Sequence, residues 1–131
     1  LRKLFPDSSI HFAATHRGAT LYIDRAQIEQ VLINLIKNAK ESCGQNTAPQ
    51  IEVELEQVPG KVCSLTVRDN GEGILPEVID KVFVPFFTTK PSGSGIGLSL
   101  CKQIMNLHGG TITVSSEIGK GSCFTLMFPG R

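Results

Sequence analysis

Two glycine-rich segments of this 131-residue chain have the residue types of a ligand-binding site. The first is Asp69-Asn70-Gly71-Glu72-Gly73-Ile74, and the second is Gly93-Ser94-Gly95-Ile96-Gly97-Leu98. Glycine lets a backbone approach a ligand where a Cβ would clash. The second segment precedes a helical pattern, and the free N–H groups at a helix N-terminus attract anions together with the helix dipole. The pattern therefore predicts a phosphate cradle.

The two segments differ from the common motifs that they partly match. The second lacks the Gly-Lys-Ser/Thr of a P-loop, and Leu98 stands where a dinucleotide fingerprint needs a glycine. The first is similar to a calcium loop, but Gly71 and Gly73 offer no side-chain oxygen. Taken alone, Gly93–Gly97 is also compatible with a plain flexible loop.

A third group of polar residues lies on a helix predicted over residues 25–43. Asn34, Asn38 and Glu41 align along one side of it, at spacings of four and three residues. Asparagine is a poor helix former, and carboxamide oxygens are suitable ligands for Mg²⁺. A solvated polar face is the alternative interpretation of this side.

The elements that must position these residues follow from periodicity. Asp24 is the expected N-cap of the long helix, Gly44 its stop, and its other side is apolar. The residues of this apolar face are Ile28, Val31, Leu32, Leu35, Ile36 and Ala39. Strands are predicted over 8–13, 20–23, 51–58, 62–68, 111–115 and 123–128, and further helices over 76–81 and 98–108.

This order predicts a single domain over residues 1–131. The expected fold is an α/β two-layer sandwich, in which a mixed, mostly antiparallel sheet of about five strands carries three helices on one face. Residues 83–96 have the composition of a mobile functional loop. We expect Phe83, Phe86 and Phe87 to pin its base to the core.

Composition excludes several function classes. The net charge of +1 gives no electrostatic signature for nucleic acid or for an anionic membrane surface, and no apolar run approaches the roughly 20 residues of a membrane span. The four cysteines form no Cys-x-x-Cys pair. They are expected to be buried reduced thiols of a cytoplasmic protein.

Together these segments resemble the ATP-binding catalytic domain of bacterial sensor histidine kinases. That domain has the Bergerat-type fold shared with gyrase, the mismatch-repair ATPases and a heat-shock chaperone. The resemblance covers about residues 24–129, and several ordered motifs make it specific. The matching segments are 34–39 (N box), 69–73 (G1 box), 83–87 (F box), 93–98 (G2 box) and 119–125 (closing strand pair).

The resemblance implies roles at the base end of a nucleotide site. Asp69 would accept a hydrogen bond from the adenine amino group, and Gly71 and Gly73 would let the base slide in. Thr125 sits where the family places a hydroxyl near this aspartate and its water. The residues implied to wall the site are Ile74, Ile96 and Leu98.

At the phosphate end, the resemblance implies that Asn38 ligates Mg²⁺ and that Asn34 contacts the phosphates of ATP. Residues 88–97 would form an ATP lid, in which Lys90 reaches the terminal phosphate and the N–H groups at Gly95–Leu98 cradle the others. The remaining lid residues expected to contact the nucleotide are Thr88, Thr89, Gly93 and Gly97.

Three residues are expected to serve catalysis: Asn38, Lys90 and Glu41. Glu41 departs from the family, because many relatives carry Lys or Arg there. It is expected to assist proton handling or to hold metal-bound water, with an exposed helix glutamate as the alternative. The ATPase branch has a glutamate base at the position of Asn34. Because asparagine cannot deprotonate water, a kinase is favoured over an ATP hydrolase.

The phosphoacceptor is absent, because none of His11, His16 and His108 is followed by an acidic residue. The expected function is transfer of the ATP γ-phosphate to a histidine on a separate dimerisation domain, with a response regulator downstream. We expect a monomeric isolated chain within a homodimeric whole protein, including as the cytoplasmic part of a membrane-bound sensor. The alternatives are a stand-alone serine kinase of the anti-sigma type and an ATP-binding pseudokinase.

Overall fold

The computed structural model describes residues 10–14, 24–44, 48–57, 63–87 and 97–129. Five strands form one sheet in the order β1-β2-β3-β5-β4. Their bounds are Ile10–Ala14 (β1), Ile51–Gln57 (β2), Cys63–Asp69 (β3), Thr111–Glu117 (β4) and Gly121–Phe128 (β5). β1 runs parallel to β2, and the other neighbouring strands pair antiparallel.

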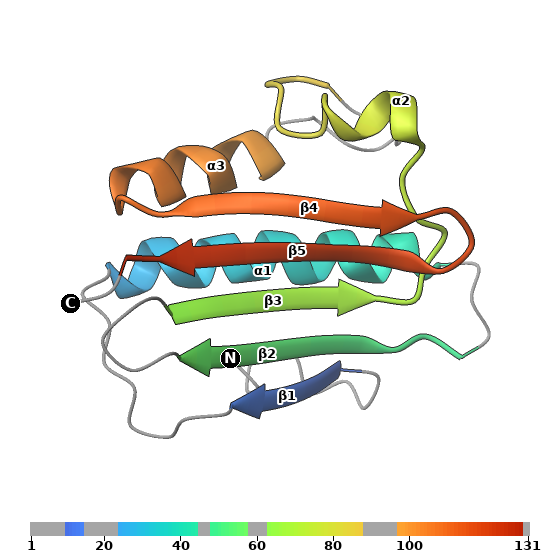
Figure 1. Ribbon diagram of the computed structural model, residues 1–131, viewed down its shortest axis with the longest axis horizontal. Coiled ribbons are helices and arrows are strands. Elements are labelled where there is room, and N and C mark those ends of the chain that lie inside the picture. The colour runs from blue at the N-terminus through green and yellow to red at the C-terminus, as the bar shows by residue number, and fades with distance from the viewer. Residues whose placement is uncertain (1–9, 15–23, 45–47, 58–62, 88–96, 130–131) are drawn as a thin grey trace.

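Two helices cover one face of this sheet (Figure 1). They are α1, Arg25–Ser42, and α3, Gly97–Leu107, which contact each other as well as the strands beneath them. The short helix α2, Pro76–Ile79, lies past the β4 side of the sheet and buries no residue. The predicted two-layer fold with a mixed, mostly antiparallel sheet is confirmed.

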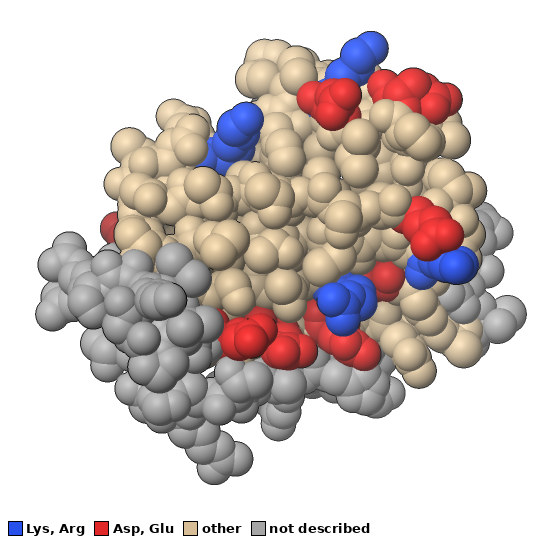
Figure 2. Space-filling view, in the orientation of Figure 1, with Lys and Arg blue, Asp and Glu red and all other residues tan. Residues whose placement is uncertain are grey.

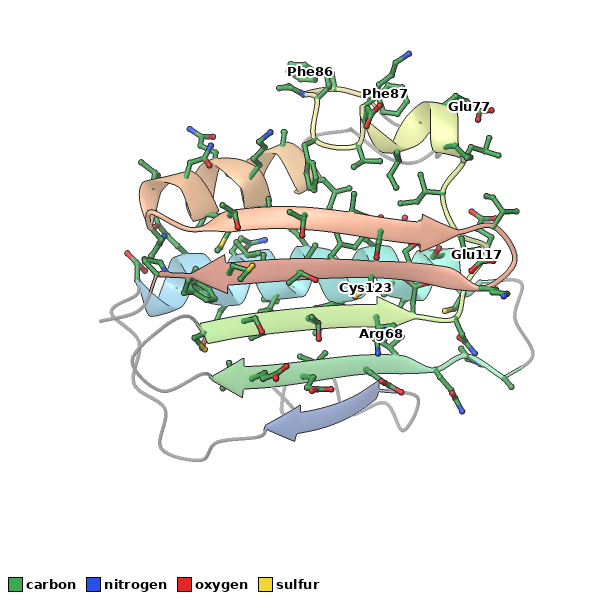
Figure 3. All side chains as sticks on the ribbon, in the orientation of Figure 1. Arg68, Glu77, Phe86, Phe87, Glu117 and Cys123 are labelled. Carbon is green, nitrogen blue, oxygen red and sulfur yellow. The ribbon has the colours of Figure 1, made fainter. Side chains whose placement is uncertain are left out.

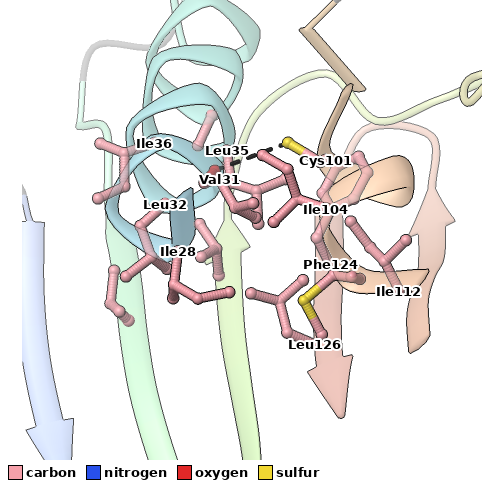
Figure 4. Close-up of a cluster of buried hydrophobic side chains, with 14 of the residues drawn as sticks. Ile28, Val31, Leu32, Leu35, Ile36, Cys101, Ile104, Ile112, Phe124 and Leu126 are labelled. Carbon is pink, nitrogen blue, oxygen red and sulfur yellow. Dashed lines mark hydrogen bonds between the residues drawn. The ribbon is translucent and has the colours of Figure 1, made fainter. Parts of the chain in front are cut away.

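The predicted apolar face of α1 is buried, as Figure 4 shows for the middle of the core. Val31, Leu35 and Ile36 have no exposed surface. Asp24 caps the helix, because its side chain accepts a hydrogen bond from the Gln27 N–H at 3.1 Å. The local signals in this part of the sequence therefore agree with the packing that the fold imposes.

His108 ties the end of α3 to the start of α1. Its Nδ1 lies 2.8 Å from the Ile104 carbonyl oxygen, which only accepts, so this nitrogen carries the hydrogen. Its Nε2 is then an acceptor, and it receives the Asp24 N–H at 3.0 Å. The two helices are thus joined by a hydrogen-bonded bridge as well as by apolar contacts.

Strand alternation separates two chemically different faces of the sheet. On β5, Ser122, Phe124, Leu126 and Phe128 are buried on the side of the helices, whereas Cys123, Thr125 and Met127 are more exposed and point to the other side. Figure 2 shows that this second face carries few charged side chains, most of them near its β2 side. They include Arg68, whose guanidinium lies 3.8 Å from the Glu52 carboxylate.

Several predicted boundaries differ from the structure. β4 and β5 are longer than the predicted 111–115 and 123–128, because Gly119 and Gly121 take positive φ angles of 82° and 129° and allow a tight turn between them. The helix predicted over 76–81 ends at Ile79. The strand predicted over 20–23 lies outside the described residues.

Two leucine-to-alanine substitutions should differ in their effect on the free energy of unfolding, because one leucine is buried and the other is exposed. Leu35→Ala should lower the free energy of unfolding by about 2–5 kcal/mol, because it leaves a cavity under α1. Leu107→Ala is the matched control, since this α3 side chain is 72% exposed; its effect should stay within about 0.5 kcal/mol. Urea denaturation measures both, and equal losses would contradict the burial of Leu35.

Candidate functional site

A buried carboxylate lies at the end of β3. Asp69 is 5% exposed, and its Oδ1 accepts hydrogen bonds from the Gly71 N–H at 2.9 Å and the Ser122 N–H at 3.3 Å. A charge is costly to bury unless hydrogen bonds compensate for its lost hydration. The residue that follows, Asn70, accepts from the Gln50 N–H at 2.8 Å and donates to the Ala48 carbonyl at 3.0 Å, which ties the segment before β2 to this strand end.

The loop after Asp69 is held between α1 and the β4–β5 turn. The Glu72 N–H donates to the Ser42 carbonyl at 3.2 Å, and the Glu72 carbonyl accepts from the Gly119 N–H at 3.0 Å. A Cβ on Gly71 would lie 2.5 Å from the Ser42 oxygen, and one on Gly73, where φ is 81°, would lie 2.5 Å from the Glu117 oxygen. The chain itself therefore requires these two glycines, whatever they do for a ligand.

The hydroxyl residue of β5 that contacts Asp69 is Ser122, through its backbone N–H, and not Thr125. Thr125 is paired with Thr66 on the far side of the sheet, whereas Ser122 lies on the helix side, where Asp69 is also buried. The structure therefore does not bring Thr125 to the expected place. The reason is register: Thr125 is three residues from Ser122, and an odd shift along a strand reverses the face.

Asn34 links α1 to the start of α3. Its Nδ2 donates to the Gly97 carbonyl at 3.4 Å, and its Oδ1 accepts from the Gln30 Nε2 at 3.1 Å. Gly97 is the last glycine of the second glycine-rich segment, so this contact places that glycine beside the predicted polar side of α1. Gln30, one turn before Asn34 on the same helix, thus supports its carboxamide.

The polar side of α1 connects the two glycine-rich segments. Asn34, Asn38 and Ser42 recur every four residues and therefore lie along one line of the helix. The first contacts Gly97, the last contacts the loop after Asp69, and the half-buried Asn38 lies between them. Glu41 is exposed, one turn beyond Asn38. Helix α1 thus brings together segments that are distant in the sequence.

Of the three apolar residues expected to wall the site, the structure describes two. Ile74 and Leu98 are partly buried and pack against the core. The other predicted wall residue and most of the predicted lid lie outside the described residues. They are Ile96, Thr88, Thr89, Lys90, Gly93 and Gly95.

The three phenylalanines after α2 do not behave alike. Phe83 packs edge-to-face on Phe124, with ring centroids 6.2 Å apart, and the Lys102 Nζ lies 5.7 Å from the centre of its ring. Phe86 is 75% exposed at the outer end of the turn (Figure 3), so the prediction that it pins the loop is wrong. Its φ of 67° reverses the chain and directs the side chain outward. Phe87 is half-buried.

The four cysteines are free thiols, as predicted, but only Cys43, Cys63 and Cys101 are buried, whereas Cys123 is half-buried. Burial raises the pKa of Cys43, and the nearby Asp69 carboxylate adds to this effect. Burial also raises the pKa of Cys101 to about 11, against a smaller opposing effect of its contact with Asn34. The Cys101 thiol donates to the Val31 carbonyl at 3.8 Å between the two main helices (Figure 4).

Within the described segments, no three His, Cys, Asp or Glu side chains gather in an arrangement that would hold a metal ion. The carboxamide oxygens on the polar side of α1 are ligands of a type suited to a hard cation. None of the helices that the structure describes is long and apolar enough to cross a bilayer.

Residues 23–131 match the family described as "Histidine kinase-, DNA gyrase B-, and HSP90-like ATPase", and the chain belongs to that family. It is 38% identical over 120 residues to the sensor histidine kinase ZraS of Escherichia coli K12, covering 92% of this chain and 25% of that protein. It is 45% identical over 93 residues to the C4-dicarboxylate transport sensor protein DctB of Rhizobium meliloti, covering 71% of this chain and 15% of that protein.

Solved structures agree with these relatives. The catalytic domain of the histidine kinase ThkA superposes with a TM-score of 0.80 at 34% identity, covering 93% of this chain and 81% of that one. The mycobacterial sensor histidine kinase MprB gives a TM-score of 0.81 at 27% identity, covering 99% and 88%. The chain is the ATP-binding catalytic domain of a sensor histidine kinase, and it spans about a quarter of the length of the ZraS relatives.

The burial of Cys101 predicts a pH-dependent stability. The unfolded thiol ionises near the ordinary pKa of 9.0, whereas the folded thiol stays protonated until about 11. A raised folded pKa contributes stability that is complete below pH 9 and is lost as pH rises to 11, here about 2–3 kcal/mol. Urea denaturation between pH 8 and 11 should show a steeper loss for the wild type than for Cys101→Ala. Parallel curves would contradict the burial of a neutral thiol.

Proposed function

We propose that this chain binds Mg·ATP and transfers the γ-phosphate to a histidine on a separate dimerisation domain, from which a response regulator is phosphorylated. The observation that carries the proposal is the convergence on α1. The buried Asp69 stands at one end of this arrangement, and Asn34 beside Gly97 stands at the other. A ligand with an apolar base and a charged phosphate chain requires two such chemically different ends.

At the base end, Asp69 accepts a hydrogen bond from the adenine amino group, and Ser122 supplies the hydroxyl that was expected from Thr125. The hydrogen bonds from Gly71 and Ser122 orient the carboxylate before any ligand arrives, which lowers the ordering cost of binding. Ile74 and Leu98 contribute apolar surface next to the base.

At the phosphate end, the oxygens of Asn34 and Asn38 fit a hard, hydrated cation. Asn38 would hold Mg²⁺, which would neutralise phosphate charge when bound. Lys90 and the N–H groups at Gly95–Leu98 are assigned to the phosphates. Phosphoryl transfer depends mainly on positioning and charge neutralisation, so these groups supply what the chain must contribute. The exposed Glu41 is assigned to proton handling.

ZraS, ThkA and MprB are named as histidine kinases, which supports a histidine rather than a serine as the phosphoacceptor. Asn34 stands where a hydrolase needs a carboxylate base, so we expect the chain alone to turn ATP over negligibly. Transfer therefore requires the partner domain, within a homodimeric protein whose catalytic part is cytoplasmic.

The role of Asn38 is testable by transfer in trans. The purified chain is incubated with labelled Mg·ATP and a matching dimerisation domain. Acid-labile, alkali-stable label should appear on the partner and should be lost with Asn38→Ala, because a metal ligand is removed. Asn106→Ala, at an exposed position on α3, is the matched control and should transfer normally.

Each of three outcomes would contradict a part of the proposal. Normal transfer by Asn38→Ala would remove this residue from the metal site. Rapid phosphate release by the chain alone, abolished by Glu41→Gln, would place the chain in the ATPase branch. ATP binding without transfer to any dimerisation domain would indicate a pseudokinase.

Asp69→Asn tests the base end. The amide retains an oxygen for the Gly71 and Ser122 N–H groups but introduces an NH₂ group, which repels the adenine amino donor. Calorimetry should show ATP binding weaker by about 1–3 kcal/mol. Asp80→Asn, at an exposed position after α2, should bind as the wild type does. Equal wild-type affinity for ATP and GTP would refute the assignment of Asp69.

A further inference from the structure

The hydroxyl of Ser116 on β4 joins the loop after Asp69 to the β4–β5 hairpin. Its oxygen lies 2.7 Å from the Ile74 nitrogen, 3.0 Å from the Gly121 carbonyl oxygen and 3.1 Å from the Ser122 hydroxyl oxygen. Ser116 is half-buried on the helix side of the sheet, the side on which the buried Ile112 and the half-buried Val114 of the same strand also lie. These three contacts determine where the hydrogens of both hydroxyls point.

A serine hydroxyl has one hydrogen to donate and two lone pairs that accept. The Gly121 carbonyl only accepts, so the hydrogen of Ser116 goes to it. The Ile74 N–H only donates, so it takes one lone pair of Ser116. The second lone pair then accepts the hydrogen of Ser122. This is the arrangement that satisfies all three contacts, and in it Ser122 has no hydrogen left for another partner.

The orientation of the Ser122 hydroxyl matters for the base end of the site, because Ser122 contacts Asp69. Ser122 is 5% exposed and gives its backbone N–H to the Asp69 Oδ1. With its hydroxyl hydrogen directed to Ser116, Ser122 keeps lone pairs only. Both side chains at this end, a carboxylate and a hydroxyl oxygen, then act as acceptors toward a ligand. Such a pair favours an amino group and disfavours a carbonyl oxygen at the same place.

We propose that Ser116 is a positioning residue for base specificity. It holds the Ser122 hydroxyl in the orientation that accepts, so that a 6-amino purine is preferred over a 6-oxo purine. The inference rests on the nucleotide site proposed above and adds to it a residue that acts through another. Without the Ser116 oxygen, the Ser122 hydroxyl regains a hydrogen to donate, and a 6-oxo group is then tolerated.

The test compares ADP with IDP, which carries an oxygen in place of the 6-amino group and a proton on N1. Calorimetry gives the ratio of the two affinities for the wild type and each variant. Ser116→Ala should lower the ADP preference about fivefold, the equivalent of one ordinary hydrogen bond. Ser116→Thr, which keeps the hydroxyl, should restore the wild-type ratio. Ser115→Ala, exposed on the other face of the same strand, should leave the ratio unchanged.

A double-mutant comparison separates this role from a structural one. If Ser116 acts through Ser122, the change in ratio caused by Ser116→Ala should disappear in a Ser122→Ala background. If Ser116→Ala does not fold, Ser116→Cys keeps nearly the same volume with a weakly hydrogen-bonding thiol, and the ratio should again fall.

An unchanged ratio in a folded Ser116 variant, or a change that persists without the Ser122 hydroxyl, would overturn the inference. The proposed function would be contradicted by a different result, namely a wild-type chain that binds neither ADP nor IDP.

Discussion

The buried carboxylate of Asp69 is the constraint on which the site depends. An ionised group that is 5% exposed must be compensated by hydrogen bonds. Those bonds come from the loop that follows it and from the hairpin beside it. The end of β3, the glycine loop and the β4–β5 hairpin are therefore held in one mutual arrangement. The loop packs so closely against the end of α1 and the β4–β5 turn that neither Gly71 nor Gly73 has room for a side chain.

Helix α1 extends that constraint across the molecule. One of its sides carries the residues that fill the core, and this burial fixes the rotation of the helix on the sheet. The polar side then faces Gly97 at one end and the loop after Asp69 at the other. Asn34 meets Gly97 there, and Ser42 meets the loop after Asp69. In this way hydrophobic packing on one side of a helix positions hydrogen-bonding groups on the other.

The limits of prediction show at particular residues. The face of α1, the Asp24 cap and the strands that the structure describes were predictable, because each depends on local periodicity or on a single local hydrogen bond. The placement of Thr125 near Asp69 was wrong, because the matched motif did not reveal the register between β3 and β5. Phe86 was misjudged because its outward direction follows from a backbone turn with positive φ. The sequence also did not reveal that the fold leaves no room for a side chain at Gly71 and Gly73, since the atoms nearest to them belong to distant segments.

The sequence by itself determined the fold class, the family and the residue types of the site. Hydrophobic periods of two and 3.6 residues and the order of the motifs carry that information within short windows. Only the tertiary structure decided that Ser122 stands beside Asp69, that the Ser116 and Ser122 hydroxyls meet, and that Gln30 supports Asn34. Strand register and helix rotation are set by burying the whole apolar surface at once, so no single segment encodes them.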